Sequence, residues 1–463
     1  MPDTSAPHDD SSVIEAGYKP QLKRGLHFFA SFSVAFSCMS VLTGVFANYG
    51  FVLQKAGPFG MWSWWLVVLG HTLVALVYAE MTGRMALAGS AYNWNTRLSR
   101  PFVGWMTGWM YVWLQFIAGA SVNITIIPIL QTLLGVQYTS LQSKAICICM
   151  ILIQALINVH GVRLASRINL ISVIIEMTAL LGFGLLIGSI VAFQGHAHLS
   201  LLTSVPHGDT NYWQPFLMAC LLGVWTMIGF EGAAEMGEET ANVHHVSPRG
   251  VFSSVLVAGI LGFILLFSLT IAIPDLKAIT ASADPIGDIT RSVIGVPLTN
   301  IFLILVLISI FACALVCNTT GARMVWAMSR DKKFPAHKFF SKVSSRQVPA
   351  AAVWLVSIVG IICVLFADTA TALYASGAVM GILAYLLTVL SFVFGNKKIP
   401  KKGAFTLGIW HWPVVILATA WLIIEVAILT VPEEFHSVAW TTGGILIAGG
   451  IVYRLFCRQK KSS

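Results

Sequence analysis

The stretch GVWTMIGFEGAAEMGEET, from Gly223 to Thr240, places four glutamates at the end of a long apolar run. Two of them, Glu231 and Glu235, are surrounded by Gly, Ala, Met, Ile and Phe. Ionisable side chains within a membrane helix are costly and usually mark a functional site. Glycines at the same point weaken the helix. The stretch therefore predicts a broken membrane helix that carries a functional site.

The composition of the whole chain agrees with a membrane protein. Hydrophobic residues make up 57% of the 463 residues and charged residues only 10%, whereas soluble domains carry about 25% charged residues. Because a helical span needs about 20 mostly apolar residues, we expect an all-α polytopic membrane protein with one membrane domain. The twelve expected spans are 28–54, 61–84, 103–134, 145–159, 168–193, 216–237, 251–273, 293–326, 351–367, 370–394, 412–431 and 438–456.

The basic residues predict how the chain is oriented in the membrane. All but four of the 28 Lys and Arg fall on the tails and alternate loops of one side, the exceptions being Lys55, Lys144, Lys277 and Arg291. Positively charged loops stay in the cytoplasm, so we expect both termini inside a plasma membrane or a bacterial inner membrane. The net charge of +9 then reflects topology and not nucleic-acid binding. No apolar signal-peptide core precedes the first span.

Several classes of membrane protein lack their sequence signatures here. The chain has no phosphate-binding loop of an ATPase, no potassium-channel filter and no helical histidine pair at metal spacing. Seven of the eight cysteines fall within expected spans, where they are expected to pack as small hydrophobes. No metal or cofactor is expected. A secondary transporter is the main interpretation, with an intramembrane enzyme or a receptor as alternatives.

A second interruption lies five spans before the first one described. The segment SCMSVLTGVFANYG, residues 37–50, mixes small and hydroxylated residues into an apolar run. Transporters built from inverted repeats often break one helix at the same position in each half and bind substrate there. The spacing predicts breaks around residues 42–44 and 228–232. It also predicts a five-plus-five inverted-repeat core of the LeuT type, with repeats at 26–193 and 213–394.

Four motifs give the chain a family resemblance that covers nearly its whole length. AEMTGRMALAGSAYNWNTRLSRPFVGWMTGW resembles the second-to-third span signature of the amino acid–polyamine–organocation superfamily of permeases. GVWTMIGFEGAAEMGEETANVHHVSPRGV is similar to its sixth-span motif, NTTGARMVWAMSRDKKFP to its eighth-span ending, and RQVPAAAV to the entry of the ninth. The closest likeness is to the amino acid/choline branch. The resemblance implies a permease domain at 26–456, with two extra helices at 412–456 and tails at 1–25 and 457–463.

The resemblance also implies a substrate site at the two breaks. The first break would present backbone amides to a carboxylate and the sixth span carbonyls to an amine, as the polarity of helix ends favours. Trp225 aligns with an aromatic residue that closes over substrate, and Glu231 with a glutamate that gates or contacts it. Helix packing is the alternative for the aromatic and small residues, and a hydrogen-bonded structural acid for Glu231. The expected substrate-binding residues are Ser40, Thr43, Gly44, Gln115, Ala120, Trp225, Ile228, Gly229, Phe230 and Glu231.

One departure from the family pattern and one acidic residue bear on substrate and coupling. Leu42 lies where many members have a small residue, and it is expected to crowd a carboxylate. This favours an amine or an ω-amino acid. Glu176 takes the place of a lysine that replaces a coupling cation in part of the family. Because burial favours the neutral form of a carboxyl, Glu176 is expected to carry protons; a neutral structural acid is the alternative.

The predicted gate lies at the inner end of the sixth span. Glu235, together with Glu238 and Glu239, is expected to approach Arg84 or Arg330 and close the inner path, although plain solvated charges are equally compatible with the sequence. Arg323 is expected to anchor the eighth span at the membrane surface.

The function expected is secondary transport of an amino acid or a small amine such as 4-aminobutyrate, choline or a polyamine. Transport is expected to be proton-coupled and to work by alternating access. The expected partners are the substrate, protons and the lipid bilayer, and no oligomeric state is predicted. The alternatives are an exchanger without proton coupling, an intramembrane enzyme that uses Ser90 or His160, and a solute-sensing receptor.

Overall fold

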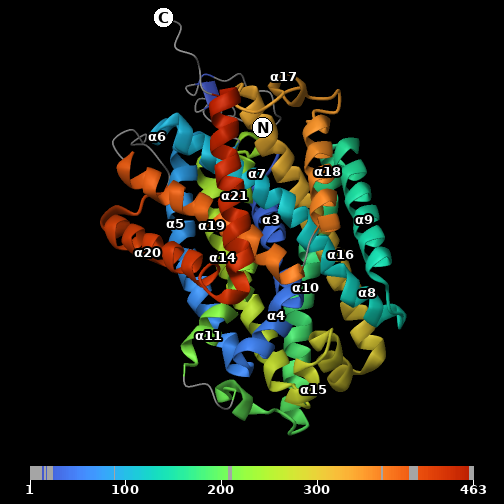
Figure 1. Ribbon diagram of the computed structural model, residues 1–463. Coiled ribbons are helices and arrows are strands. Elements are labelled where there is room, and N and C mark those ends of the chain that lie inside the picture. Colours follow the sequence, from blue (N-terminus) through green and yellow to red (C-terminus); the bar gives the residue numbers. More distant parts are fainter. Residues whose placement is uncertain are drawn as a thin grey trace, which may run out of the picture.

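A computed structural model describes residues 13–14, 17, 24–87, 89–206, 211–366, 369–395 and 405–457, with no side chains for 162 and 163. In this part of the chain long helices stand side by side (Figure 1). Eleven are long and apolar enough to cross a bilayer, and α18 (Ala350–Phe366) is shorter. The predicted all-α polytopic fold is confirmed. Most of the predicted tails, 1–25 and 457–463, lies outside the described residues.

Each of the twelve expected spans corresponds to a helix or a group of helices, with shifted ends. The fourth, expected at 145–159, extends over Ser140–His160, and the eighth continues from Pro285 to Arg330 with a kink at Gly295. Besides α18, the elements are α3 (Phe28–Met39), α4 (Val41–Ala56), α5 (Ser63–Arg84), α6 (Ser90–Leu98), α7 (Pro101–Ile124), α8 (Ile126–Leu134), α9 (Ser140–His160), α10 (Val162–Phe193), α11 (Trp213–Ala219), α12 (Leu221–Met227), α13 (Gly232–Glu235), α14 (Val243–Ile271), α15 (Leu276–Thr280), α16 (Pro285–Arg330), α17 (His337–Phe340), α19 (Ala370–Phe394), α20 (His411–Ile428) and α21 (His436–Val452).

The first span is broken at Ser40, between α3 and α4. Ser40 has the left-handed backbone conformation φ 38°, ψ 89°, which L-residues adopt at a cost. The break was predicted at residues 42–44, and the structure moves it toward the N-terminus. The reason is that α4 has already begun there, since the Gly44 N–H donates to the Ser40 carbonyl over 3.0 Å.

The sixth span is broken between α12 and α13, within the predicted range. Ile228 is extended at φ −80°, ψ 136°, and Gly229 has φ +119°, a conformation that favours glycine. A Cβ at Gly229 would also lie 2.7 Å from the Cys38 Cβ and 3.0 Å from the Met39 nitrogen. Gly229 therefore allows the two breaks to touch.

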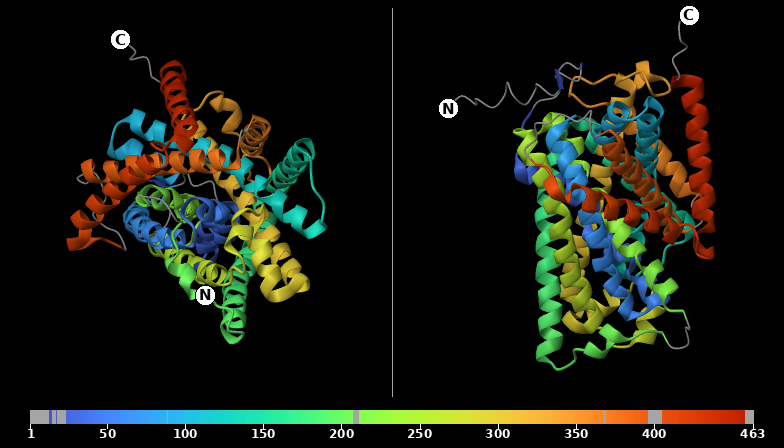
Figure 2. Two further views of the ribbon diagram at one scale, coloured as in Figure 1. Left: turned by 60° about the horizontal axis from the view of Figure 1, so that its bottom comes forward. Right: turned by 90° about the vertical axis from the view of Figure 1, so that its left-hand side faces the viewer.

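The broken helices lie inside the bundle, and the two ends of the bundle differ. The broken helices α3, α4, α12 and α13 pack against the long helices around them, namely α5, α10, α14, α16 and α19. One end, at the top of Figure 1, carries α17, and the other carries α15. The start of α3 and the end of α21 both lie at the first of these ends (Figure 2). Because Arg24, Arg84, Arg323 and Arg330 also lie there, we name it the basic end.

The outer surface of the bundle is apolar. Leu69, Ile260, Ile362 and Trp440 all have exposed side chains. Lipid tails accept such a surface and leave backbone polar groups to bond within the helices. The surface is therefore that of a multi-pass membrane protein.

Candidate functional site

A small cavity lies where the two breaks meet α7 and α16. Its volume is about 30 Å³. Five of the predicted substrate-binding residues line it: Thr43, Gln115, Trp225, Ile228 and Gly229. The remaining lining residues are Cys38, Met39, Leu114, Ala118, Val122, Cys313 and Cys317.

The other predicted site residues lie around the cavity without lining it. Ala120 packs with Ile127 and Cys147 in a separate cluster, because Gln115, Ala118 and Val122 recur at helical spacing on one face of α7 while Ala120 lies off that face. Gly44 faces Thr226, whose hydroxyl would overlap a Cβ at Gly44. Gly44 thus allows α4 to approach α12 closely.

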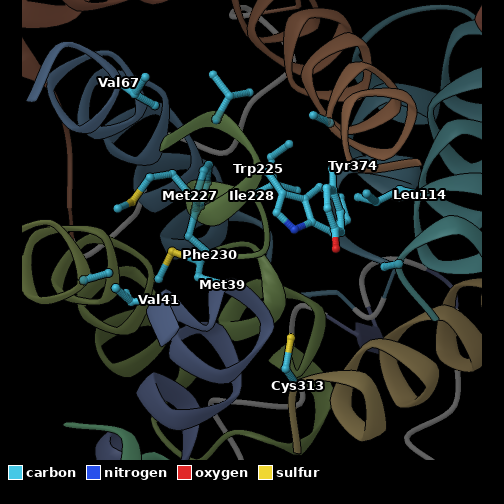
Figure 3. Packing of buried hydrophobic residues seen from close by; sticks show 14 of the residues in the cluster. Met39, Val41, Val67, Leu114, Trp225, Met227, Ile228, Phe230, Cys313 and Tyr374 are labelled. Atoms are coloured by element: carbon cyan, nitrogen blue, oxygen red, sulfur yellow. The ribbon is translucent and has the colours of Figure 1, made fainter. Parts of the chain in front are cut away.

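Phe230 and Glu231 both contact the buried side chain of Tyr385, next to the cavity. The Phe230 ring stacks on Tyr385 with 4.9 Å between centroids, and it lies on the other side of the chain from Trp225 (Figure 3). The Tyr385 hydroxyl donates to a Glu231 carboxylate oxygen, and the Gly229 N–H donates to the same oxygen over 3.1 Å. Glu231 therefore holds the backbone of the second break in place.

Two aromatic rings separate the small cavity from a larger one. Trp225 lines the small cavity, and Tyr374 lines a cavity of about 500 Å³ that reaches toward the end opposite the basic end. The two ring centroids are 5.6 Å apart, and Figure 3 shows the rings against each other. The larger cavity is also lined by Lys144 and by Asp284, and burial raises the pKa of the Asp284 carboxyl above its usual range.

Glu176 on α10 reaches the first break. Its Oε1 accepts hydrogen bonds from the Ser40 hydroxyl over 3.0 Å and from the Leu42 N–H over 3.1 Å. The carboxyl group thereby occupies the N-terminus of α4, where a negative charge is favoured. The Ser40 hydroxyl is also 2.7 Å from the Thr43 hydroxyl, so a chain of hydroxyl groups joins Glu176 to the cavity wall. Leu42 contributes its N–H to this contact, and its side chain is not part of the cavity lining.

Gln115 presents an unused hydrogen-bond acceptor at the cavity. Within the described part of the chain, its buried Oε1 has no hydrogen-bond partner, although buried polar atoms normally have one. The lining contains no Asp, Glu, Lys or Arg. At about 30 Å³ the cavity has room for about two water molecules in this state. Once widened, it can offer the Gln115 oxygen to an uncharged group or a zwitterion.

Ion pairs close the basic end; the pairing of Arg330 with Glu238 was among those predicted, and the pairing of Arg323 with Glu239 was not. Arg323 contacts Glu239 through two hydrogen bonds of 2.8 and 3.2 Å, and Arg330 lies 3.4 Å from Glu238. Arg84 contacts Glu80 within its own helix. Glu235 itself is buried, and the arginines that it was expected to approach contact other acids. Arg323 was expected to anchor α16 at the membrane surface, but it pairs with Glu239 in the segment after α13.

The residues just before α3 complete this closure. Arg24 Nη1 donates to the carbonyl oxygens of Gly237 and Thr240 over 3.1 and 2.8 Å. Leu26 pairs with the same segment through the backbone of Glu239 and Ala241. These bonds tie the start of the first broken helix to the end of the second.

Sequence reasoning did not identify several residues around the site. Cys38, Cys313 and Cys317 were expected only to pack, yet all three line the cavity. The four-residue spacing of Cys313 and Cys317 places them on one helix face, which is a usable signal. Tyr374 and Tyr385 lie on α19, and no local pattern distinguishes them from other buried tyrosines.

Gly44→Ala is expected to destabilise the protein, because its methyl group would overlap the Thr226 side chain. Overpacking of this kind costs about 1–3 kcal/mol, measured as a fall in the free energy of unfolding in detergent. Gly119→Ala is the control, since a Cβ there meets nothing within 4 Å. Equal stability of Gly44→Ala and wild type would contradict the close contact between α4 and α12.

Comparison of the sequence with known proteins identifies its family. A model of the family described as "Amino acid permease" matches residues 26–453. The amino-acid permease BAT1 of Arabidopsis thaliana is 26% identical, over 92% of this chain and 89% of that protein. The branched-chain amino acid permease BcaP of Lactococcus lactis is 29% identical, over 70% of this chain and 71% of that protein.

Proposed function

The chain belongs to the amino acid permease family of the amino acid–polyamine–organocation superfamily, and from that premise we propose that it carries amino acids with small, uncharged side chains. It acts as a transporter and not as an enzyme, as its relatives do. The observation that carries the substrate proposal is the uncharged lining of the cavity between the two breaks.

The chemistry of the lining supports a net-neutral substrate. When Glu176 is protonated, a zwitterion would place its carboxylate toward the N-terminal turn of α4 near Thr43 and its ammonium toward the carbonyls that end α12. An additional charge on the side chain would have no counter-charge in the lining, and a buried unpaired charge is costly. Glu231 does not neutralise an amine here, because it does not line the cavity and one of its carboxylate oxygens holds Tyr385 and the Gly229 N–H. Choline and polyamines are therefore less suitable substrates than neutral amino acids.

The two ends of the bundle support an alternating-access cycle. The larger cavity reaches the end opposite the basic end, while ion pairs close the basic end. If the basic end is cytoplasmic, as its positive charge favours, this state opens to the outside up to Trp225 and Tyr374. Substrate entry would part these rings, and the ion pairs would then separate to open the inner path.

Glu176 is our candidate for proton coupling. Its carboxylate bonds to the first break through Ser40 and Leu42, so protonation would remove the negative charge from the N-terminus of α4 and weaken this contact. Because Ser40 also contacts Thr43, the cavity wall would respond to the protonation state. Proton binding and movement of the broken helix would thus be linked.

A thermal-shift panel on the purified protein tests the substrate proposal. A ligand that binds the folded protein at 100 times its Kd stabilises it by about 2.7 kcal/mol. Neutral amino acids are expected to raise the melting temperature, whereas choline, putrescine, lysine and glutamate are not. Stabilisation by choline or putrescine and not by any neutral amino acid would reject the proposal.

Arg323→Gln is expected to weaken the closure of the basic end. Glu239 would lose its partner, and breaking a buried ion pair costs about 3 kcal/mol or more. The measurement is the rate at which a membrane-impermeant thiol reagent, added on the side of the basic end, labels Cys38, Cys313 and Cys317. Because 1.4 kcal/mol corresponds to a factor of ten, the rate is expected to rise at least about tenfold. Lys338→Gln, an exposed change at the same end, should label as wild type does; an unchanged rate in Arg323→Gln would count against this gate.

A further inference from the structure

A buried histidine and a buried glutamate meet between the bundle and one of the two extra helices. His71 on α5 and Glu425 on α20 approach to 3.2 Å, from Nδ1 to Oε1, and both side chains are fully buried. The pair lies apart from the substrate cavity, and neither residue lines it. Nothing in the transport mechanism proposed above uses these two groups.

The surroundings of the pair do not support two full charges. Within the described residues, both ring nitrogens of His71 and both carboxyl oxygens of Glu425 lack a hydrogen bond of good geometry. The Trp421 indole packs closely against Gly70 and lies beside the carboxyl. A buried ion pair repays the cost of desolvation only when further hydrogen bonds satisfy both partners. A neutral carboxylic acid and a neutral imidazole 3.2 Å apart avoid this cost.

The other side of the imidazole faces the substrate site. The edge of His71 contacts the rings of Phe230 and Tyr385, with centroid distances of 6.3 and 6.2 Å. Tyr385 donates to Glu231, which holds the second break. The titratable neighbours on other elements are Tyr385 on α19 and Cys220, between α11 and α12, which lies near Glu425. His71 therefore links α20 to the rings beside the second break, in addition to the direct packing of α20 on α19.

We propose that His71 and Glu425 hold one proton between them and form a proton-binding site, separate from Glu176, through which α20 regulates the substrate site. Loss of the proton leaves a lone carboxylate between α5 and α20, and gain of a second proton leaves a lone imidazolium. Either charge lacks a partner, which weakens the contact of α20 with α5 and disturbs the rings that hold Glu231. Transport is then fastest over the pH range in which the pair holds one proton.

Infrared spectroscopy of the purified protein tests proton binding without any need for transport. The carbonyl stretch of a protonated carboxylic acid near neutral pH is expected in wild type and is expected to lose intensity in Glu425→Gln. Glu433→Gln, which changes an exposed acid in the loop before α21, should leave this band unchanged. Equal band intensity in Glu425→Gln and wild type overturns the proposal.

The effect on transport, which does rest on the proposed function, is tested with a double variant. His71→Leu/Glu425→Leu replaces both partners by apolar groups, a change that buried pairs often tolerate. We expect it to retain uptake with an unchanged KM and to shift the pH at half-maximal rate by about one unit on at least one side. A pH profile that superimposes on that of wild type overturns the regulatory role. If wild type itself transports no amino acid, the proposed function fails, while the infrared result still decides whether the pair holds a proton.

Discussion

Glu176→Gln is expected to bind substrate as wild type does but to lose proton-driven accumulation. The glutamine oxygen can still accept hydrogen bonds from Ser40 and from the Leu42 N–H, which bond Glu176 in wild type, so the first break should keep its shape. Glutamine cannot bind and release a proton. With one proton per substrate, a gradient of one pH unit supports about tenfold accumulation, because one unit corresponds to about 1.4 kcal/mol, and the variant should lose this factor.

The measurement is uptake into proteoliposomes with and without an inward proton gradient. Exchange of internal for external substrate serves as the internal control, since it needs no net proton movement and should persist in Glu176→Gln. Glu433→Gln should accumulate substrate as wild type does. If Glu176→Gln still responds to the gradient, Glu176 is a structural acid, and coupling either uses Glu231 or is absent, as in an exchanger.

Trp225→Ala is expected to reduce uptake by about two- to tenfold, because the ring pair with Tyr374 is worth about 0.5–1.5 kcal/mol beyond its buried area. Trp225 is 7% exposed and lines the cavity on one side, so its loss removes part of the barrier between the two cavities. The fold should be affected less, as measured by the melting temperature in detergent.

Two further variants separate a gate from a packing residue. Trp225→Phe keeps an aromatic ring against Tyr374 and should restore most of the uptake. Trp440→Ala removes a tryptophan that is 82% exposed on the outer surface and should have no effect on uptake. Uptake at the wild-type level in a well-folded Trp225→Ala protein would show that Trp225 only packs between helices and does not gate the cavity.

The fold could be predicted from the sequence because helices that cross a bilayer require long apolar runs and basic loops on one side. Apolar runs of span length and the distribution of Lys and Arg depend on local composition alone. The position of each break was harder to predict. Gly229 lies at the second break. The first break was predicted near Gly44 but lies at Ser40. Gly44 instead lies within α4, where it allows close contact with Thr226.

Residues next to a break could be placed near the cavity from the sequence, whereas most residues on helices distant in sequence could not. Thr43, Trp225 and Gly229 line the cavity, and their contact with substrate stays a prediction. Tyr385 lies 154 residues from Glu231 along the chain, and only the packed bundle brings the two together. Ala118 lines the cavity, whereas Ala120 was predicted to do so. Which residues of α7 face the cavity depends on how this helix is rotated against its neighbours, and the sequence does not give that rotation.

The most direct test of the proposed function is uptake of radiolabelled substrates by the purified protein in proteoliposomes. We expect a neutral amino acid with a small side chain to accumulate under an inward proton gradient, and a protonophore to abolish the accumulation. Gln115→Leu, which removes the free oxygen at the cavity, should alter the order of preference among neutral amino acids. Uptake of choline or a polyamine, with no uptake of any neutral amino acid, would contradict the substrate site described here.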